Sequence, residues 1–236
     1  MSELIRPSTN LPSNRKEFTF QTEDGLTLVG EVASPIGDRS ASILCFHPNP
    51  TGGGMMDSHI YKKAANRLPE MAGIEIIRFN TRGTTSERGT SDGEYGNGDS
   101  EIYDVVASIN YCFDYLGVTN LWIMGWSFGT EIALKYAKDA RIKGLILLSP
   151  PLMKVSDGEL AYWAQDGRRI VALIPEHDDY LKPAEARTRF SVIPQIELIA
   201  VDDAKHLWVG EPAVYRVLSE ITKVVAPNRL PLPTEY

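Results

Sequence analysis

The stretch that decides the fold is Leu121-Trp122-Ile123-Met124-Gly125-Trp126-Ser127-Phe128-Gly129-Thr130-Glu131. Its first residues form a short apolar run that is typical of a buried strand, and a helical pattern begins after it. Between the two lies Gly-x-Ser-x-Gly, in which a sharp turn pushes the serine oxygen into the open and requires small residues two before and two after it. Gly125 and Gly129 meet that requirement. A serine that caps a helix is the alternative, but the strand and helix on either side favour Ser127 as a nucleophile.

Short apolar runs recur on both sides of this stretch. They are nearly continuous, as in parallel strands covered on both faces, and they span residues 43–46, 74–79, 121–124, 145–148, 170–174 and 196–201. Amphipathic segments with helical spacing lie between them, at about 56–70, 99–116, 128–139, 183–190 and 212–225. This alternation predicts an α/β fold with a doubly wound, mostly parallel sheet, whose site lies at the carboxyl ends of the strands.

The two ends of the chain differ from this pattern. Alternating runs at 17–22 and 26–33 flank Asp24-Gly25, a dipeptide typical of tight hairpins, so we expect an N-terminal antiparallel hairpin. The composition, with 43% hydrophobic residues, suits one folded domain. We predict a polar N-terminal tail at 1–16, the domain at 17–226 and a Pro-rich C-terminal tail at 227–236.

Charge and composition exclude several classes of protein. With 24 Lys and Arg against 31 Asp and Glu, the net charge is −7, and the cations are not clustered, so we expect no nucleic-acid partner. No apolar stretch is long enough for a membrane helix. The N-terminal residues lack the apolar core of a secretory signal, and two cysteines cannot form a disulfide scaffold, which together predict a cytoplasmic protein. The chain shows neither zinc spacing nor a phosphate-binding glycine motif, so we expect no metal and no cofactor.

A serine nucleophile requires a base, and the chain has four histidines. His206 follows the last apolar run and precedes the last helical segment, where a loop can bring an imidazole over Ser127. His59 lies in the first helical segment and is interpreted as a surface or core histidine. His47 ends the run 43–46 and belongs to another part of the site. We therefore predict that His206 is the general base.

An acid must orient this base by accepting a hydrogen bond from its second ring nitrogen. It is expected after the run 170–174, where Asp178 and Asp179 compete for the role. Asp157, after the run 145–148, is a more distant alternative. The order along the chain, serine then acid then histidine, is the order known for this kind of turn.

The oxyanion that forms during acyl transfer needs two backbone N–H donors. Phe128, directly after the nucleophile, is expected to supply one. The other should come from the loop His47-Pro48-Asn49-Pro50, where the prolines have no N–H. We therefore predict that Asn49 is the second donor.

These motifs resemble those of the α/β-hydrolases, and more narrowly the small bacterial hydrolases with His-Pro-His-Pro and Gly-Gly after the third strand. Here the corresponding residues are His47-Pro48-Asn49-Pro50 and Gly52-Gly53, and the resemblance covers roughly residues 25 to 225. In related folds the spacing of the acid's turn favours Asp178 over Asp179. Larger relatives insert a cap domain where this chain has only residues 149–169, which implies little or no cap. Asn49 replaces the family's second histidine, which keeps the backbone donor but removes an imidazole.

The resemblance implies a serine hydrolase that works through an acyl-enzyme. We expect a carboxylesterase acting on small or exposed acyl esters, with a small-molecule acyl substrate as its partner. A thioesterase, an amidase or peptidase, or an acyltransferase would use the same three residues. A binding protein that has the hydrolase fold without its chemistry is the rival from another class, and the intact order of Ser127, Asp178 and His206 disfavours it.

Overall fold

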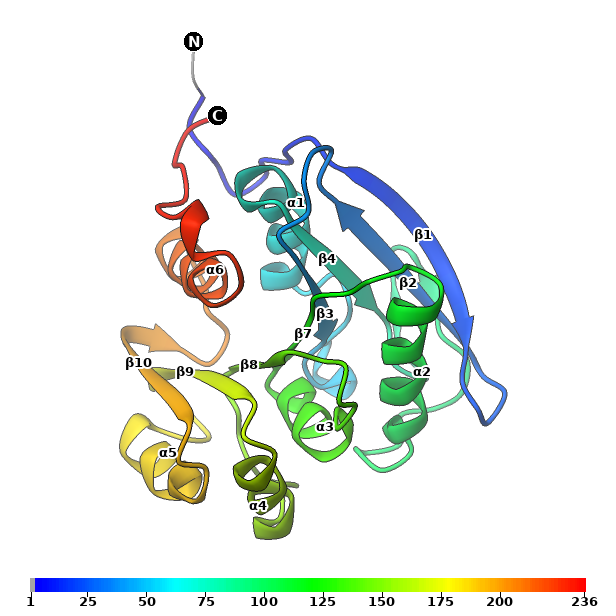
Figure 1. Ribbon diagram of the computed structural model, residues 1–236, viewed down its shortest axis with the longest axis vertical. Coiled ribbons are helices and arrows are strands. Elements are labelled where there is room, and N and C mark those ends of the chain that lie inside the picture. Colours follow the sequence, from blue (N-terminus) through cyan, green and yellow to red (C-terminus); the bar gives the residue numbers. More distant parts are fainter. Residues whose placement is uncertain (1–2) are drawn as a thin grey trace.

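The computed structural model describes residues 3–236 and consists of an eight-stranded sheet between two layers of helices (Figure 1). The strand order is β1-β2-β4-β3-β7-β8-β9-β10. In this order the strands from β4 through β3 to β10 run parallel to one another. At one edge β2 pairs antiparallel with β4, and β1 pairs antiparallel with β2. Their bounds are β1 (Asn14–Gln21), β2 (Thr27–Ser34), β3 (Ala41–Phe46), β4 (Ile74–Phe79), β7 (Leu121–Trp126), β8 (Gly144–Leu148), β9 (Arg169–His177) and β10 (Ile196–Lys205).

Six α-helices connect these strands and cover both faces of the sheet. They are α1 (His59–Ala72), α2 (Glu101–Asp114), α3 (Phe128–Tyr136), α4 (Asp157–Asp166), α5 (Pro183–Arg189) and α6 (Glu211–Val225). Helices α1 and α6 lie on one face, and α2 and α3 lie on the other (Figure 1). Shorter elements complete the chain: η1 (Pro50–Gly52), η2 (Phe190–Val192), η3 (Pro227–Arg229) and the small hairpin of β5 (Thr85–Ser86) and β6 (Gly89–Thr90).

The central strands are apolar throughout because each serves two cores. In β3, Ile43 and Cys45 pack in the core under α1 and α6, while Leu44 and Phe46 pack in the core under α2 and α3. All four side chains are buried. Alternate residues of a strand point to opposite faces, so a strand with helices on both sides must be apolar at every position.

The predicted fold class is confirmed: the sheet is mostly parallel and begins with an antiparallel hairpin. The hairpin turns at Asp24-Gly25, where Gly25 has a φ of +87°, a conformation that favours glycine. Between β8 and β9 the chain forms only α4, so no cap domain stands above the sheet. Two elements differ from the prediction. Helix α4 lies in the segment treated as a short insertion, and the β5–β6 hairpin lies in the Gly-rich segment treated as a loop.

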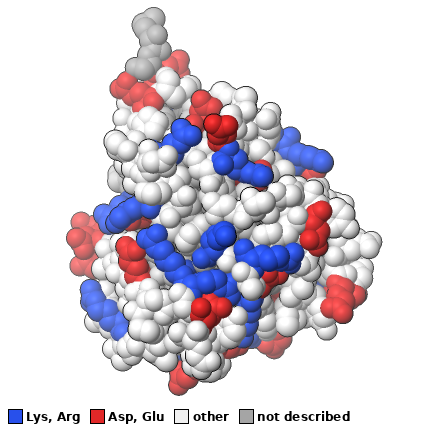
Figure 2. Space-filling view, viewed as in Figure 1, with Lys and Arg blue, Asp and Glu red and all other residues white. Residues whose placement is uncertain are grey.

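The two ends of the described chain lie side by side (Figure 1). Leu4 forms a bridge with Glu235, and the N–H of Glu3 donates to the carbonyl of Tyr236 over 2.9 Å. On the face seen in Figure 2, lysine and arginine side chains form a band across the middle, with acidic side chains around it. Among residues 3–236, no helix has both the length and the apolar character that crossing a bilayer requires.

Candidate active site

Ser127 lies in the turn between β7 and α3, with a φ of +52° and a ψ of −119°. Such a backbone conformation is strained for a residue with a side chain. The turn is possible because the flanking glycines allow close packing: a Cβ on Gly125 would lie 2.5 Å from the carbonyl oxygen of Gly129, and one on Gly129 would overlap the carbonyl of Phe46. The strain leaves the side chain of Ser127 partly exposed, next to the ends of β3 and β8.

Two side chains from separate turns meet beside this serine. The Oγ atom of Ser127 lies 2.9 Å from Nε2 of His206, in the turn after β10. The other ring nitrogen, Nδ1, lies 2.9 Å from Oδ2 of Asp178, in the turn after β9. A carboxylate can only accept, so Nδ1 carries the proton and Nε2 is free to accept from the hydroxyl of Ser127. The structure therefore brings together Ser127, His206 and Asp178 in one chain of hydrogen bonds.

Asp178 is held as an ionised acceptor. Burial alone would raise its pKa, but the hydrogen bonds from His206 and from the backbone N–H groups of Tyr180 and Leu181 outweigh burial and leave the pKa below its ordinary value. The other two acids considered from the sequence lie elsewhere. Asp179 and Asp157 are exposed, and neither is hydrogen-bonded to His206 in the part of the chain that the structure describes.

The two expected oxyanion donors lie in neighbouring segments. Gly129 packs against the carbonyls of Phe46 and His47, so the start of α3 contacts the loop after β3. Within residues 3–236, neither the N–H of Asn49 nor that of Phe128 takes part in a hydrogen bond. The side chain of Asn49 turns the other way, where its Oδ1 accepts from the N–H of Thr51 over 3.1 Å and caps η1. Both N–H groups thus lack a partner within the described chain, as the oxyanion prediction requires of them.

His47 fixes the base of this loop. Its Nδ1 lies 2.7 Å from the carbonyl of Pro48, and its Nε2 accepts from the N–H of Thr81 over 3.0 Å. The ring is completely buried, and burial lowers its pKa to about 4. A neutral His47 therefore ties the loop after β3 to the loop after β4, two residues before Asn49.

Two residues hold the backbone of the base, a role that the sequence did not predict for either of them. The indole N–H of Trp126 and the hydroxyl of Ser149 each donate to the backbone carbonyl of His206, both over 3.1 Å. Trp126 is the variable position before the serine in Gly-x-Ser-x-Gly, and Ser149 directly follows β8. Their places at strand ends indicated that both could lie near the site. Their contacts with His206 could not be read from the sequence, because Ser149 and Trp126 lie 57 and 80 positions before it.

Only one group among the described residues could hold a metal ion, and it lies at the ends of β9 and β10. Glu176, His177 and Asp203 offer donor atoms within 4.8 Å of one another, and all three side chains are exposed. His177 and its two acids stand apart from the hydrogen bonds of the serine site.

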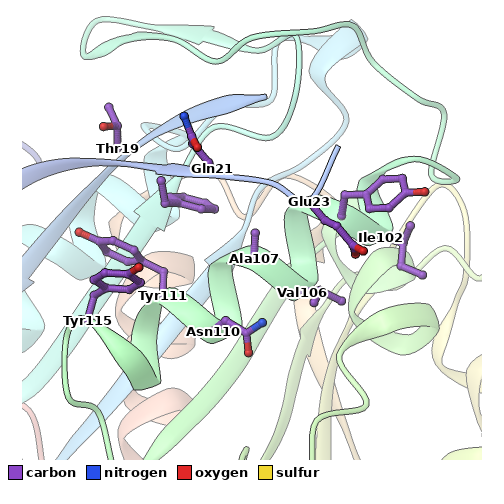
Figure 3. A pocket seen from close by; sticks show the side chains of 11 residues that line it. Thr19, Gln21, Glu23, Ile102, Val106, Ala107, Asn110, Tyr111 and Tyr115 are labelled. Atoms are coloured by element: carbon purple, nitrogen blue, oxygen red, sulfur yellow. The ribbon is translucent and has the colours of Figure 1, made fainter. Parts of the chain in front are cut away.

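A groove of about 810 Å³ lies between β1 and α2 (Figure 3). In it the rings of Tyr111 and Tyr115 are stacked, with centroids 5.3 Å apart, and Asn110 and Gln21 line the same space. None of Ser127, Asp178 and His206 lines this groove.

The chain belongs to the α/β-hydrolase fold family, whose family model matches residues 42–202. This match runs from β3 into β10 and includes Ser127 and Asp178 but ends just before His206.

Solved structures with the same fold include an α/β serine hydrolase homologue from Coxiella burnetii, which is 24% identical with a TM-score of 0.76 over 92% of this chain and 100% of that one. A serine hydrolase without a lid from Xanthomonas campestris is 22% identical with a TM-score of 0.75, over 96% and 100% of the two chains. A curated proline iminopeptidase from Xanthomonas citri is 30% identical over 125 residues, which are 53% of this chain. The match spans 36% of the length of that peptidase.

Proposed function

We propose that this protein is a serine hydrolase, and specifically a carboxylesterase that acts on small or exposed acyl esters. The observation that carries the proposal is the chain of two 2.9 Å hydrogen bonds from Ser127 through His206 to Asp178. A hydroxyl beside an oriented, neutral imidazole is the arrangement that activates serine for attack on a carbonyl.

In the first half of the reaction, Ser127 Oγ attacks the carbonyl carbon of the ester while His206 Nε2 takes the hydroxyl proton. Asp178 stabilises the imidazolium that results, and its backbone hydrogen bonds keep it ionised for this task. The tetrahedral intermediate collapses when His206 returns the proton to the leaving alcohol. In the second half, His206 activates a water molecule, which attacks the acyl-enzyme and releases the acid.

The N–H groups of Asn49 and Phe128 would stabilise the oxyanion in both halves. Rigid donors contribute most to catalysis when they are aligned before the charge develops. The loop that carries Asn49 meets this condition, because His47 is hydrogen-bonded to Pro48 and Thr81 and because Pro48 and Pro50 restrict the backbone on either side.

An ester with an exposed acyl group fits the surroundings of the serine. Only α4 lies between β8 and β9, where a cap would stand, so little of the chain could enclose a large acyl group. Tyr180 is exposed, and its ring centroid lies 4.6 Å from that of His206. An aromatic surface beside the proton donor would favour esters whose leaving group is apolar.

Two measurements test the proposal. The purified protein and its Ser127→Ala variant are incubated with a fluorophosphonate, and intact mass is recorded. We expect one adduct on the unmodified protein and none on the folded variant. Absence of an adduct on the folded, unmodified protein would favour a binding protein with a hydrolase fold.

A substrate panel then separates the reaction classes that share these three residues. Matched p-nitrophenyl esters, acyl thioesters and N-terminal prolyl amides would be compared by kcat/KM. The proposal requires the esters to be the best substrates. The amide series is included because of the similarity to a proline iminopeptidase, and a preference for prolyl amides would replace the esterase assignment with a peptidase.

A further inference from the structure

The turn that carries His206 is held through two successive backbone carbonyls. Trp126 and Ser149 donate to the first, that of His206 itself. The second belongs to Leu207, and its oxygen lies 2.6 Å from Nε2 of His59. Since a carbonyl can only accept, Nε2 of His59 must carry a proton and donate it.

His59 reaches this turn from a distant part of the sequence. It is the first residue of α1, 148 positions before Leu207. Its ring stands edge-on to Trp126, with ring centroids 5.3 Å apart and an interplanar angle of 88°. The imidazole therefore touches both Leu207 and the indole that holds the carbonyl of His206.

The turn requires such support because its own backbone is strained. Asp203 and Trp208, three residues before and two residues after His206, have φ values of +56° and +52°. These left-handed conformations are unfavourable for residues other than glycine. Leu207 is exposed, so its own side chain supplies little packing, whereas Trp208 is fully buried in the core under α1 and α6. The packing of Trp208 anchors one end of the turn, and the hydrogen bonds to the carbonyls of His206 and Leu207 hold the backbone before it.

The charged groups near His59 do not disturb this contact. Lys63, one turn later in α1, and Glu211, at the start of α6, face the ring and pair with each other. Burial is the main cause that lowers the pKa of His59, so the ring is neutral at neutral pH. Nε2 can donate in both the neutral ring and the imidazolium, so the hydrogen bond to Leu207 does not depend on the protonation state.

We infer that His59 is a positioning residue, which aligns His206 with Ser127 by holding the carbonyl of Leu207. The inference rests on the proposed function, since it assigns a role within the same reaction. His59 contacts neither Ser127 nor Asp178, so its loss should slow proton transfer without weakening substrate binding. A neutral hydrogen bond has a net worth that corresponds to about a tenfold change in rate.

Two substitutions of His59 that introduce side-chain amides of different length test this role. In His59→Gln the side-chain nitrogen can occupy the place of Nε2, whereas in His59→Asn the amide is one carbon too short. We expect the Asn variant to lose about tenfold in kcat and in the rate of fluorophosphonate labelling, with KM within about twofold, and the Gln variant to stay within about threefold. His59→Phe, which keeps a ring against Trp126 without a donor, should behave like the Asn variant.

Lys63→Met is the matched control, because it removes one of the two α1 cations that pair with Glu211 of α6 without touching the turn of His206. We expect its kcat to be unchanged. A loss of kcat in Lys63→Met equal to that in His59→Asn would mean that any disturbance of α1 has the same effect and would overturn the role of His59. Wild-type kcat in both His59→Asn and His59→Phe would overturn it as well, and so would a change confined to KM.

The Ser127→Ala variant separates this inference from the proposed function. Labelling that persists in Ser127→Ala, or a wild-type protein that does not react, would remove the proposed function and the role of His59 with it. Labelling that depends on Ser127 but proceeds at the wild-type rate in His59→Asn would remove only the role of His59. If His59→Phe does not fold, as judged by its thermal unfolding, the comparison of the Gln and Asn variants still decides.

Discussion

The carboxylate of Asp178 is shared between His206 and the backbone of its own turn. One oxygen lies 2.9 Å from Nδ1 of His206, and the other accepts the N–H groups of Tyr180 and Leu181. The second set of bonds fixes the carboxylate independently of the histidine. The position of the acid is thus set before the reaction begins, and within residues 3–236 its side-chain hydrogen-bond partner is the base.

This division predicts a clear result for Asp178→Asn. The remaining Oδ1 can still accept both backbone N–H groups, so the turn should fold normally. The new amide would donate to Nδ1 and favour the wrong tautomer of His206, which should lower kcat by about 10⁴. Steady-state ester hydrolysis measures the loss, and Asp179→Asn is the control because that side chain is exposed. If Asp179→Asn is the variant that loses activity, the assignment of the acid is wrong.

Asn49→Pro tests the oxyanion donor after β3. Asn49 has a φ of −52°, which proline can adopt, and its N–H has no hydrogen-bond partner within residues 3–236. Proline should therefore remove the donor with little strain and lower kcat by about 10² to 10³. Asn49→Ala retains the N–H and loses only the cap on η1, so its kcat should fall much less. Equal kcat values for the two folded variants would place the donor elsewhere.

Gly129→Ala tests whether the serine turn depends on close backbone packing. The added Cβ would overlap the carbonyl of Phe46, which forces α3 away from β3. We expect a loss of about 1–3 kcal/mol in the free energy of unfolding, measured in urea, together with loss of labelling at Ser127. Gly52→Ala is the matched control, since its Cβ would meet no atom within 4 Å. A stable Gly129→Ala variant would contradict the packing argument.

The features that sequence alone predicted are those with local signals. The turn at Ser127 combines a strand, two glycines and a helix within eleven residues, and the sheet follows from apolar runs of the right length. Asp178 and Asp179 are adjacent in sequence, so only the resemblance to related folds favoured Asp178, and the structure distinguishes the two by burial and by the hydrogen bond to His206.

The features that were missed depend on weaker or more distant signals. Ser156 caps helix α4 and forms a capping box with Glu159, a pattern that was present in the sequence. The helix has only two buried side chains to mark its face, Leu160 and Trp163. The small β5–β6 hairpin pairs only two residues in each strand, too few for alternation to be visible. His59 was interpreted as a surface or core histidine because its contact with Leu207 joins residues 148 positions apart, and no local pattern encodes such a contact.

The pH dependence of stability should report on His47. Its folded pKa is about 4, against 6.5 for an ordinary histidine, so the unfolded chain binds more protons than the folded one between these values. The stabilisation is present above pH 6.5 and decreases as the pH falls toward 4. Between pH 7 and pH 5 we expect a loss of about 2 kcal/mol from this group.

Urea unfolding at several pH values measures that loss, and His47→Gln provides the comparison, because glutamine does not titrate. If the substitution weakens the hydrogen bonds to Pro48 and Thr81, the variant is less stable at pH 7 already. The quantity to compare is therefore the change in the free energy of unfolding with pH, and not its value at one pH. The slope between pH 5 and pH 6.5 should be smaller in the variant by about the contribution of one proton. Equal slopes would mean that His47 titrates in the folded protein as it does in the unfolded chain, and the loop that carries Asn49 would then rest on a charged histidine at pH 5.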